Sequence, residues 1–106
     1  AIDLKSAMTE FAKVTEGAVF VSHNLTFDYS FVNKAFEKTG VDNKMYFGKL
    51  DTISIAFARL YDVKSSFTFS LRSLCELFKI ENSKAHSALA DTKALVQVYK
   101  KMFGLR

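Results

Sequence analysis

The chain has 106 residues, enough for one small domain with a continuous core. Hydrophobic residues make up 49% and charged residues 25%, which excludes an intrinsically disordered chain. No apolar run is long enough to span a bilayer, and Asp3 and Lys5 interrupt any signal-peptide pattern, so we expect no membrane association. Fifteen basic and eleven acidic residues give a formal charge of +4, which slightly favours an anionic partner such as nucleic acid. The single cysteine, Cys75, excludes an intrachain disulfide and a cysteine-based zinc site and fits a cytoplasmic location.

The first half of the chain predicts two helices and two short strands. Apolar residues at three-and-four spacing predict a helix over residues 2–14, which Gly17 ends. The apolar run at 18–21 is typical of a strand buried on both faces, as in parallel sheets. A second helix is expected from about 27 to 38, followed by a strand over 45–50. The buried face of that helix is expected to hold Phe31, Val32, Ala35 and Phe36.

The second half predicts three further helices. The first begins after Asp51 or Thr52 as a cap, and the next has Ser70 as its cap. The last covers residues 87–103. We expect the Ser70-capped helix to bury Leu71, Leu74, Cys75 and Phe78, with Cys75 as a core residue and not a nucleophile. We expect the last helix to bury the stripe Ala88, Leu89, Thr92, Leu95, Val96, Tyr99, Met102 and Phe103.

The element order is α-β-α-β-α-α-α, which indicates an α/β fold with a parallel strand pair. Two strands alone make a poor sheet, because both of them are edges. The run at 18–21 predicts neighbours on both sides that this chain does not obviously supply.

Two acidic residues stand where a purely structural helix would not place them. Asp28 shares a helix side with Phe31 and Val32, and Asp91 lies one turn before Leu95 at the edge of the apolar stripe. A buried carboxylate is costly unless a positive group meets it. The structural alternative is that both are first-turn or boundary acids favoured by the helix dipole.

Three further polar residues accompany these acids. His23 and Asn24 follow the first strand, at the edge where open α/β sheets bind their ligands. They can equally be loop residues that satisfy turn hydrogen bonds. His86 precedes the last helix, so it would reach a common site from the pre-helical turn, or else be an exposed or capping histidine. Two carboxylates and a histidine without cysteine ligands suit Mg²⁺ or Mn²⁺.

These residues resemble motifs of a known family. Residues 21–28, Val-Ser-His-Asn-Leu-Thr-Phe-Asp, resemble the second motif, His-Asn-x-x-Phe-Asp, of the DEDD-type 3′–5′ exonucleases. Residues 86–91, His-Ser-Ala-Leu-Ala-Asp, resemble the third motif in its histidine form, His-x-Ala-x-x-Asp. Asp51-Thr52 resembles the family's helix-opening Asp-Thr pair, and residues 71–78 resemble its Leu-x-x-Leu-Cys helix. Because Ser87 stands where the tyrosine subclass has tyrosine, the resemblance is to the histidine subclass, and within it to the proofreading epsilon subunits of bacterial DNA polymerase III.

The resemblance implies an RNase H-like fold and hydrolysis of terminal phosphodiesters with two divalent metal ions, Mg²⁺ or Mn²⁺. It implies that Asp28 and Asp91 are metal ligands and that His86, with an ordinary pKa of about 6.5, accepts the proton of the attacking water. Asn24 and Phe27 would contact the terminal nucleotide, with His23 in support. The implied partners are a single-stranded 3′ end, DNA favoured over RNA, and a DNA polymerase subunit.

The chain departs from the family in one respect, because the first motif, Asp-x-Glu, is absent. The residues two positions after the six aspartates are Lys5, Ser30, Lys44, Ile53, Lys64 and Lys93. We therefore expect residues 1–106 to be the carboxyl-terminal portion of a single exonuclease domain, truncated at the N-terminus. Two carboxylates anchor Mg²⁺ only weakly, so we expect this chain alone to be inactive.

Two other functions remain open at the level of sequence. A non-catalytic interaction or scaffold module could retain part of the fold, which the missing first motif favours. Simple nucleic-acid binding would draw on the +4 charge, but the lysines are scattered and do not share one helix face.

Overall fold

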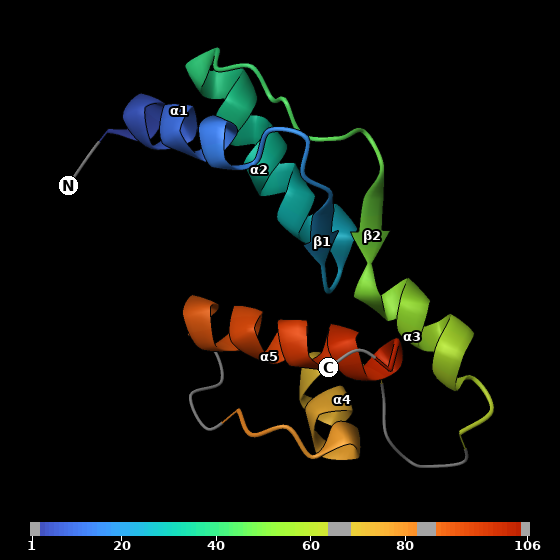
Figure 1. Cartoon of the computed structure of the whole chain (residues 1–106). Helices are drawn as coiled ribbons and strands as arrows, with labels where there is room; N and C mark the ends of the chain where they lie inside the picture. The colour runs from blue at the N-terminus through green and yellow to red at the C-terminus, as the bar shows by residue number, and fades with distance from the viewer. Residues whose placement is uncertain (1–2, 64–68, 83–86, 105–106) are drawn as a thin grey trace. The chain divides into compact units, whose positions relative to one another are not determined.

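The computed structural model describes residues 3–63, 69–82 and 87–104. It consists of two compact units, Ala1–Asp51 and Thr52–Arg106, each of which has its own core. Among the described residues the element order is the predicted one, with two short parallel strands and five helices (Figure 1). The bounds are α1 Leu4–Val14, β1 Phe20–Ser22, α2 Leu25–Thr39, β2 Lys49–Asp51, α3 Thr52–Leu60, α4 Leu71–Phe78 and α5 Ala88–Met102.

The first unit packs α1 against α2 and lays α2 on the strand pair (Figure 1). Met8, Ala12 and Phe36 form its buried centre, with Phe11 and Val32 packed against them. Gly17 has φ 74°, a left-handed conformation that lets the chain turn out of α1 without strain at Cβ. The α2 prediction was correct for Val32, Ala35 and Phe36, which are buried or half-buried, and wrong for Phe31, which is 63% exposed. Phe31 lies about 100° round the helix from Val32, outside the stripe that faces α1.

The strands pair in parallel, with Phe20 opposite Lys49, Val21 opposite Leu50 and Ser22 opposite Asp51. The prediction that the first strand is buried on both faces was wrong. Phe20 and Ser22 face α2, whereas Val21 is 37% exposed and its register partner Leu50 is 36% exposed. Side chains alternate along a strand, and within this unit only one face of the pair is covered by a helix.

The second strand is shorter than the predicted 45–50. Hydrogen bonds from Gly17 N–H to Lys44 O and from Tyr46 N–H to Ala18 O keep the two segments side by side upstream of β2. The rings of Tyr46 and Phe47 lie 4.5 Å apart, which the alternation of an extended strand would prevent. The Tyr46 ring also covers Gly48, where an added Cβ would come within 2.8 Å of it. Regular pairing therefore begins only at Lys49.

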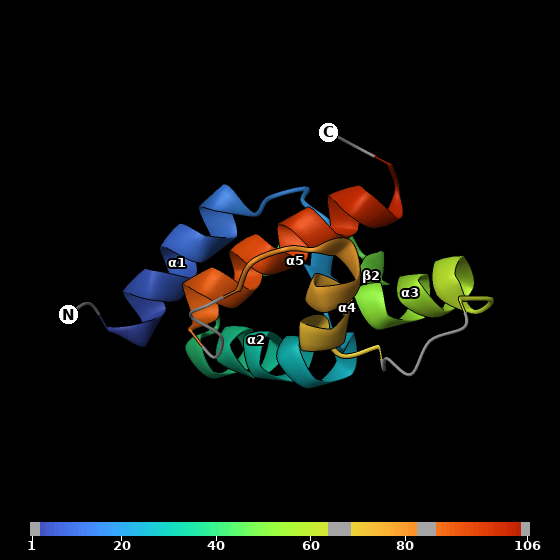
Figure 2. The same ribbon diagram turned by 90° about the horizontal axis from the view of Figure 1, so that it is seen from below.

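The second unit packs α3 and α4 against α5 (Figure 2). Its core is formed by Ala56, Leu74, Cys75, Ala94, Val98 and Met102. On α5 the prediction was correct for Met102, which is buried, and for Leu95 and Tyr99, which are half-buried. It was wrong for Leu89, which is 65% exposed, and for Val96, which is 45% exposed. The buried stripe, Ala94, Val98 and Met102, is turned by roughly 100° from the predicted one.

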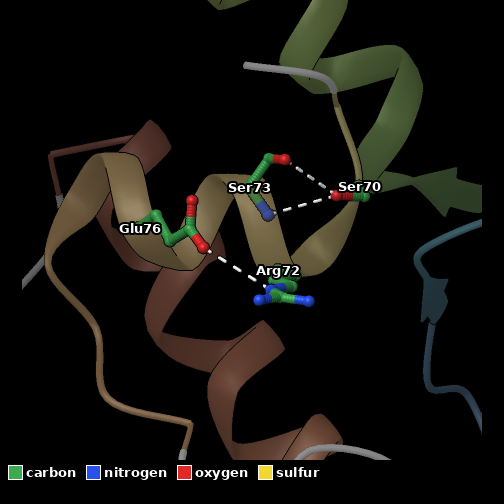
Figure 3. Close-up of polar contacts among 4 residues, drawn as sticks. All are labelled: Ser70, Arg72, Ser73 and Glu76. Carbon is green, nitrogen blue, oxygen red and sulfur yellow. Dashed lines mark hydrogen bonds and ion pairs between the residues drawn. The ribbon is translucent and has the colours of Figure 1, made fainter.

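Polar contacts also hold the helices of this unit, at the start of α4, along α4 and at the end of α5. Ser70 caps α4 as predicted, accepting the Ser73 N–H at 3.1 Å and donating to Ser73 Oγ at 3.0 Å (Figure 3). Arg72 and Glu76 pair across one turn of α4 at 3.5 Å, and both are well exposed, so this ion pair adds little stability. Arg59 of α3 donates from Nε to the Met102 carbonyl at the end of α5, at 3.0 Å.

Candidate active site

The junction of β1 and α2 contains three of the candidate residues. His23 and Asn24 connect the two elements, and Phe27 lies in the first turn of α2. Asn24 adopts a left-handed conformation, φ 78°, which asparagine tolerates better than most residues. Its side chain makes no capping hydrogen bond to the helix that it precedes. His23 is half-buried between Ser22 and Asn24, so the predicted His-Asn pair lies at the carboxyl end of β1, as expected.

A carboxylate from the neighbouring strand replaces that missing cap. Asp51, the last residue of β2, accepts the Asn24 N–H at 3.2 Å through Oδ1 and the Leu25 N–H at 3.0 Å through Oδ2. The sequence predicted Asp51 or Thr52 as a cap for α3, and α3 indeed begins at Thr52. The contact of Asp51 with the start of α2 was not predicted. It arises because Ser22 and Asp51 are register partners at the carboxyl end of a parallel pair.

Asp28 is the fourth residue of α2. Its N–H is directed to the carbonyl of Asn24 at 3.4 Å, and its Oδ2 accepts a hydrogen bond from the buried Ser22 hydroxyl. The side chain is exposed and lies in the first turn, where the helix dipole favours a negative charge. Asp28 precedes Val32 by one turn, so it starts the stripe that packs into the core.

Phe27, the residue before Asp28, presents an exposed aromatic ring. It is 60% exposed and packs edge-to-face on Phe31, with ring centroids 5.1 Å apart. An exposed ring on a fixed helix provides a surface on which a nucleobase can stack.

Asp91 occupies the equivalent position on α5. It too is the fourth helical residue, with its N–H bound to the Ser87 carbonyl at 2.9 Å. Its Oδ1 accepts a hydrogen bond from Asn82 Nδ2 at 3.1 Å. The side chain is half-buried and falls in line with Ala94 and Val98, so Asp91 begins the buried stripe of α5 instead of lying at its edge.

Cys75 is a core residue, as predicted. It is buried in the cluster that holds Leu74 and Val98. Burial raises the pKa of its thiol, and the negative charge of Asp91 raises it further. A thiol that stays neutral is a poor nucleophile, in line with the prediction that Cys75 is a core residue.

The remaining candidates are only partly placed. His86 lies outside the described residues. Asp28 belongs to the first unit and Asp91 to the second, and each is described within its own unit. Among residues 3–63, 69–82 and 87–104, no three His, Cys, Asp or Glu side chains come together as a metal site.

Two hydrogen-bond donors at these acids were missed by sequence reasoning. Ser22 was named only as part of residues 21–28, and Asn82 was not singled out. The position of Ser22, at the carboxyl end of a strand, is a signal that could have identified it. Asn82 has no such signal, because its contact with Asp91 spans an irregular connection.

Comparison with known proteins decides the family. The RNase_T family model, described as "Exonuclease", matches residues 2–99. This chain belongs to the exonuclease family. A DNA polymerase III PolC-type from Caldanaerobacter subterraneus subsp. tengcongensis is 31% identical over 101 residues, which are 93% of this chain and 7% of that protein. A Ribonuclease T from Haemophilus influenzae is 37% identical over 89 residues, 77% of this chain and 35% of that protein. A PolC-type polymerase from Staphylococcus aureus is 28% identical over 100 residues, 94% of this chain and 7% of that protein.

This exonuclease-family chain thus spans a small part of the relatives it matches, 7% of the polymerases and 35% of the ribonuclease. The family match confirms the α/β, RNase H-like exonuclease fold that the motifs implied, here helix-rich with two parallel strands. Members of the family generally use divalent metal ions. In the part of the chain that the structure describes, no helix is long and apolar enough to cross a membrane.

Proposed function

We propose that these residues supply the second and third acidic motifs of a metal-dependent 3′–5′ exonuclease. The proposal rests on the matching positions that Asp28 and Asp91 hold in their own helices. Each is the fourth residue of a helix, each starts the stripe that packs into its core, and each receives a hydrogen bond from a neutral side chain. Such donors fix the orientation of a carboxylate and leave its negative charge for a cation.

The donor type of these acids fits Mg²⁺ or Mn²⁺, which prefer carboxylate oxygen. The number of donors is smaller than the metal needs, because the sequence holds no Asp-x-Glu motif and the described residues form no cluster of three. Asp28 and Asp91 are therefore proposed as two ligands of a larger set. Bound metal would lower the pKa of water and offset charge on the phosphate.

The proposed roles of the protein residues follow the hydrolysis. His86 accepts a proton from the attacking water as the water oxygen bonds to phosphorus. The bond between phosphorus and the 3′ oxygen of the preceding nucleotide breaks, and that oxygen takes a proton from solvent. A nucleoside 5′-monophosphate leaves. Asn24 and Phe27 hold the terminal nucleotide, with Phe27 stacking on its base and His23 supporting the turn.

The proposed substrate is the single-stranded 3′ end of DNA, in preference to RNA, and the proposed partner is a DNA polymerase subunit. Support comes from the matched polymerases, while the matched Ribonuclease T keeps RNA as the alternative. The discriminating assay uses 5′-labelled DNA and RNA oligonucleotides of one sequence, each with a free or a 3′-phosphorylated end. Shortening of free-ended DNA alone supports the proposal. Equal cleavage of oligonucleotides with free and with 3′-phosphorylated ends would contradict the proposal.

We further propose that residues 1–106 are the carboxyl-terminal part of one exonuclease domain and are inactive alone. The encoded sequence upstream of Ala1 tests this directly, because an Asp-x-Glu on an apolar strand would complete the ligand set. A longer form that includes those residues should gain nuclease activity over the 106-residue chain. Equal activity of the two forms would contradict the proposal.

The second candidate function is a non-catalytic interaction or scaffold module. The missing Asp-x-Glu favours it. It predicts that the longer form binds no Mn²⁺ in calorimetric titration and does not shorten DNA. Saturable Mn²⁺ binding that is lost in Asp28→Asn, and kept in Asp42→Asn on an exposed loop of the same unit, would exclude it.

A further inference from the structure

Asp51 makes a contact that neither the motifs nor the proposed chemistry accounts for. It is the last residue of β2, and its two carboxylate oxygens accept the backbone N–H groups of Asn24 and Leu25 at 3.2 and 3.0 Å. These partners are 27 and 26 residues away in sequence. The contact therefore links the carboxyl end of one strand to the start of the helix that follows the other.

The start of α2 needs such a contact. The first N–H groups of a helix have no acceptor within the helix, and a side chain at the preceding residue usually supplies one. Asn24 occupies that position in a left-handed conformation and makes no side-chain cap. A carboxylate is well suited to the task, since it also interacts favourably with the positive end of the helix dipole.

The contact of Asp51 stabilises the segment that contains Asp28, the acid of the motif. Asp51 fixes Asn24 and Leu25 directly, and Asp28 follows Leu25 by one turn of helix. On the other side, Ser22 is both the register partner of Asp51 and the hydrogen-bond donor to Asp28. The segment from Ser22 to Asp28 is thus attached to β2 at one point and to β1 at another.

We propose that Asp51 is a positioning residue for the motif of Asn24, Phe27 and Asp28. Its carboxylate sets the orientation in which the start of α2 presents these side chains. The proposal rests on the proposed exonuclease function, and it extends that function to a residue outside the metal-ligand set.

The first test measures amide hydrogen exchange in the 106-residue chain, which needs neither metal nor substrate. Asp51→Ala should speed exchange at Asn24 and Leu25 by about tenfold, because both amides lose their acceptor. Asp51→Asn keeps one acceptor oxygen and should restore part of the protection. Asp3→Ala is the matched control, since Asp3 accepts the Ser6 N–H at 2.7 Å as the cap of α1, which carries none of the motif residues.

The second test measures kcat and KM for 3′-end hydrolysis in the longer, active form. Asp51→Ala should lower kcat at least tenfold, Asp51→Asn should recover part of it, and Asp3→Ala should leave kcat unchanged at a comparable loss of thermal stability. If the longer form is active but Asp51→Ala leaves amide exchange at Asn24 and Leu25 unchanged, the positioning role is wrong and the proposed exonuclease function stands. The same conclusion follows if Asp3→Ala lowers kcat as much as Asp51→Ala does. A wild-type longer form without nuclease activity would overturn the proposed function, and the positioning role with it, whatever the exchange rates show.

Discussion

Asn82 donates a hydrogen bond from its side-chain amide to Oδ1 of Asp91 at 3.1 Å. Ser22 makes the corresponding contact to Oδ2 of Asp28 in the other unit. Both donors are neutral, so neither cancels the charge of the carboxylate that it holds. Each of these hydrogen bonds orients the carboxylate of a motif acid, and a deprotonated carboxylate is the form that binds a divalent cation.

Removal of the donor to Asp91 should cost measurable stability. Asn82→Ala leaves a half-buried carboxylate with one hydrogen bond fewer, and we expect the free energy of unfolding to fall by about 1 kcal/mol. Urea denaturation measures the change. The matched control is Asn33→Ala, which breaks an exposed amide–carboxylate bond to Glu37 at 3.2 Å and should cost at most a few tenths of that value. Equal losses of unfolding free energy in the two variants would mean that burial of Asp91 does not increase the contribution of its hydrogen bond to stability.

Removal of the donor to Asp28 should affect metal binding more than stability. Ser22→Ala releases one oxygen of an exposed carboxylate, so its orientation toward a cation is no longer fixed. We expect Mn²⁺ affinity of the longer form to fall roughly tenfold, as measured by calorimetric titration. Ser30→Ala on the same helix is the control, because Ser30 donates only to the Phe27 carbonyl and should bind Mn²⁺ like the wild type. An unchanged affinity in Ser22→Ala would remove Ser22 from the site.

The rotated stripe of α5 predicts a sharp contrast between two valines. Val98 is fully buried and Val96 is 45% exposed on the same helix. We expect Val98→Ala to lower the free energy of unfolding by about 2 kcal/mol, through lost burial and the cavity that remains, and Val96→Ala to change it by less than about 0.5 kcal/mol. Thermal or urea denaturation of the pair measures this. A larger loss of stability in Val96→Ala than in Val98→Ala would favour the buried face predicted from the sequence.

The raised pKa of Cys75 predicts a pH dependence at the alkaline end. The unfolded thiol ionises near the ordinary cysteine pKa of 9.0, while burial and the charge of Asp91 raise the pKa of the folded thiol above it. The unfolded state therefore binds fewer protons above this pH, and stability falls as the pH rises through the folded pKa. Cys75→Ala should flatten this decline in denaturation curves taken between pH 8 and 10, at a cost in stability at neutral pH. A decline of the same slope in both proteins would assign it to other groups.

Much of this architecture could be predicted from the sequence, because element order follows from local patterns. The glycine at the end of α1, the Ser70 cap and the apolar run of β1 each act through neighbours in the chain. The face of α5 that is buried could not be predicted in this way. Ala94 and Val98 are the same residue types as Ala88 and Val96 on the adjoining face, and they are buried because α4 packs on that side.

The candidate site, too, could be predicted only in its local features. The motif acids were singled out because their residue types and spacing are local, and each lies in the first turn of its helix, the position that the structural alternative gave them. The contacts that hold them were not found. Asp51 reaches Leu25 across 26 residues and Asn82 reaches Asp91 across nine, and no periodicity in the chain reports a contact at such separations.

The role of Asp91 as a metal ligand of a 3′–5′ exonuclease is best tested by the rate at which 5′-labelled single-stranded DNA is shortened from its 3′ end. The longer form is assayed with saturating Mg²⁺ as wild type, as Asp91→Asn, and as Asp62→Asn, an exposed aspartate of the same unit. We expect Asp91→Asn to lower kcat at least about a hundredfold and Asp62→Asn to match the wild type. Asp91→Asn with wild-type kcat would contradict that role.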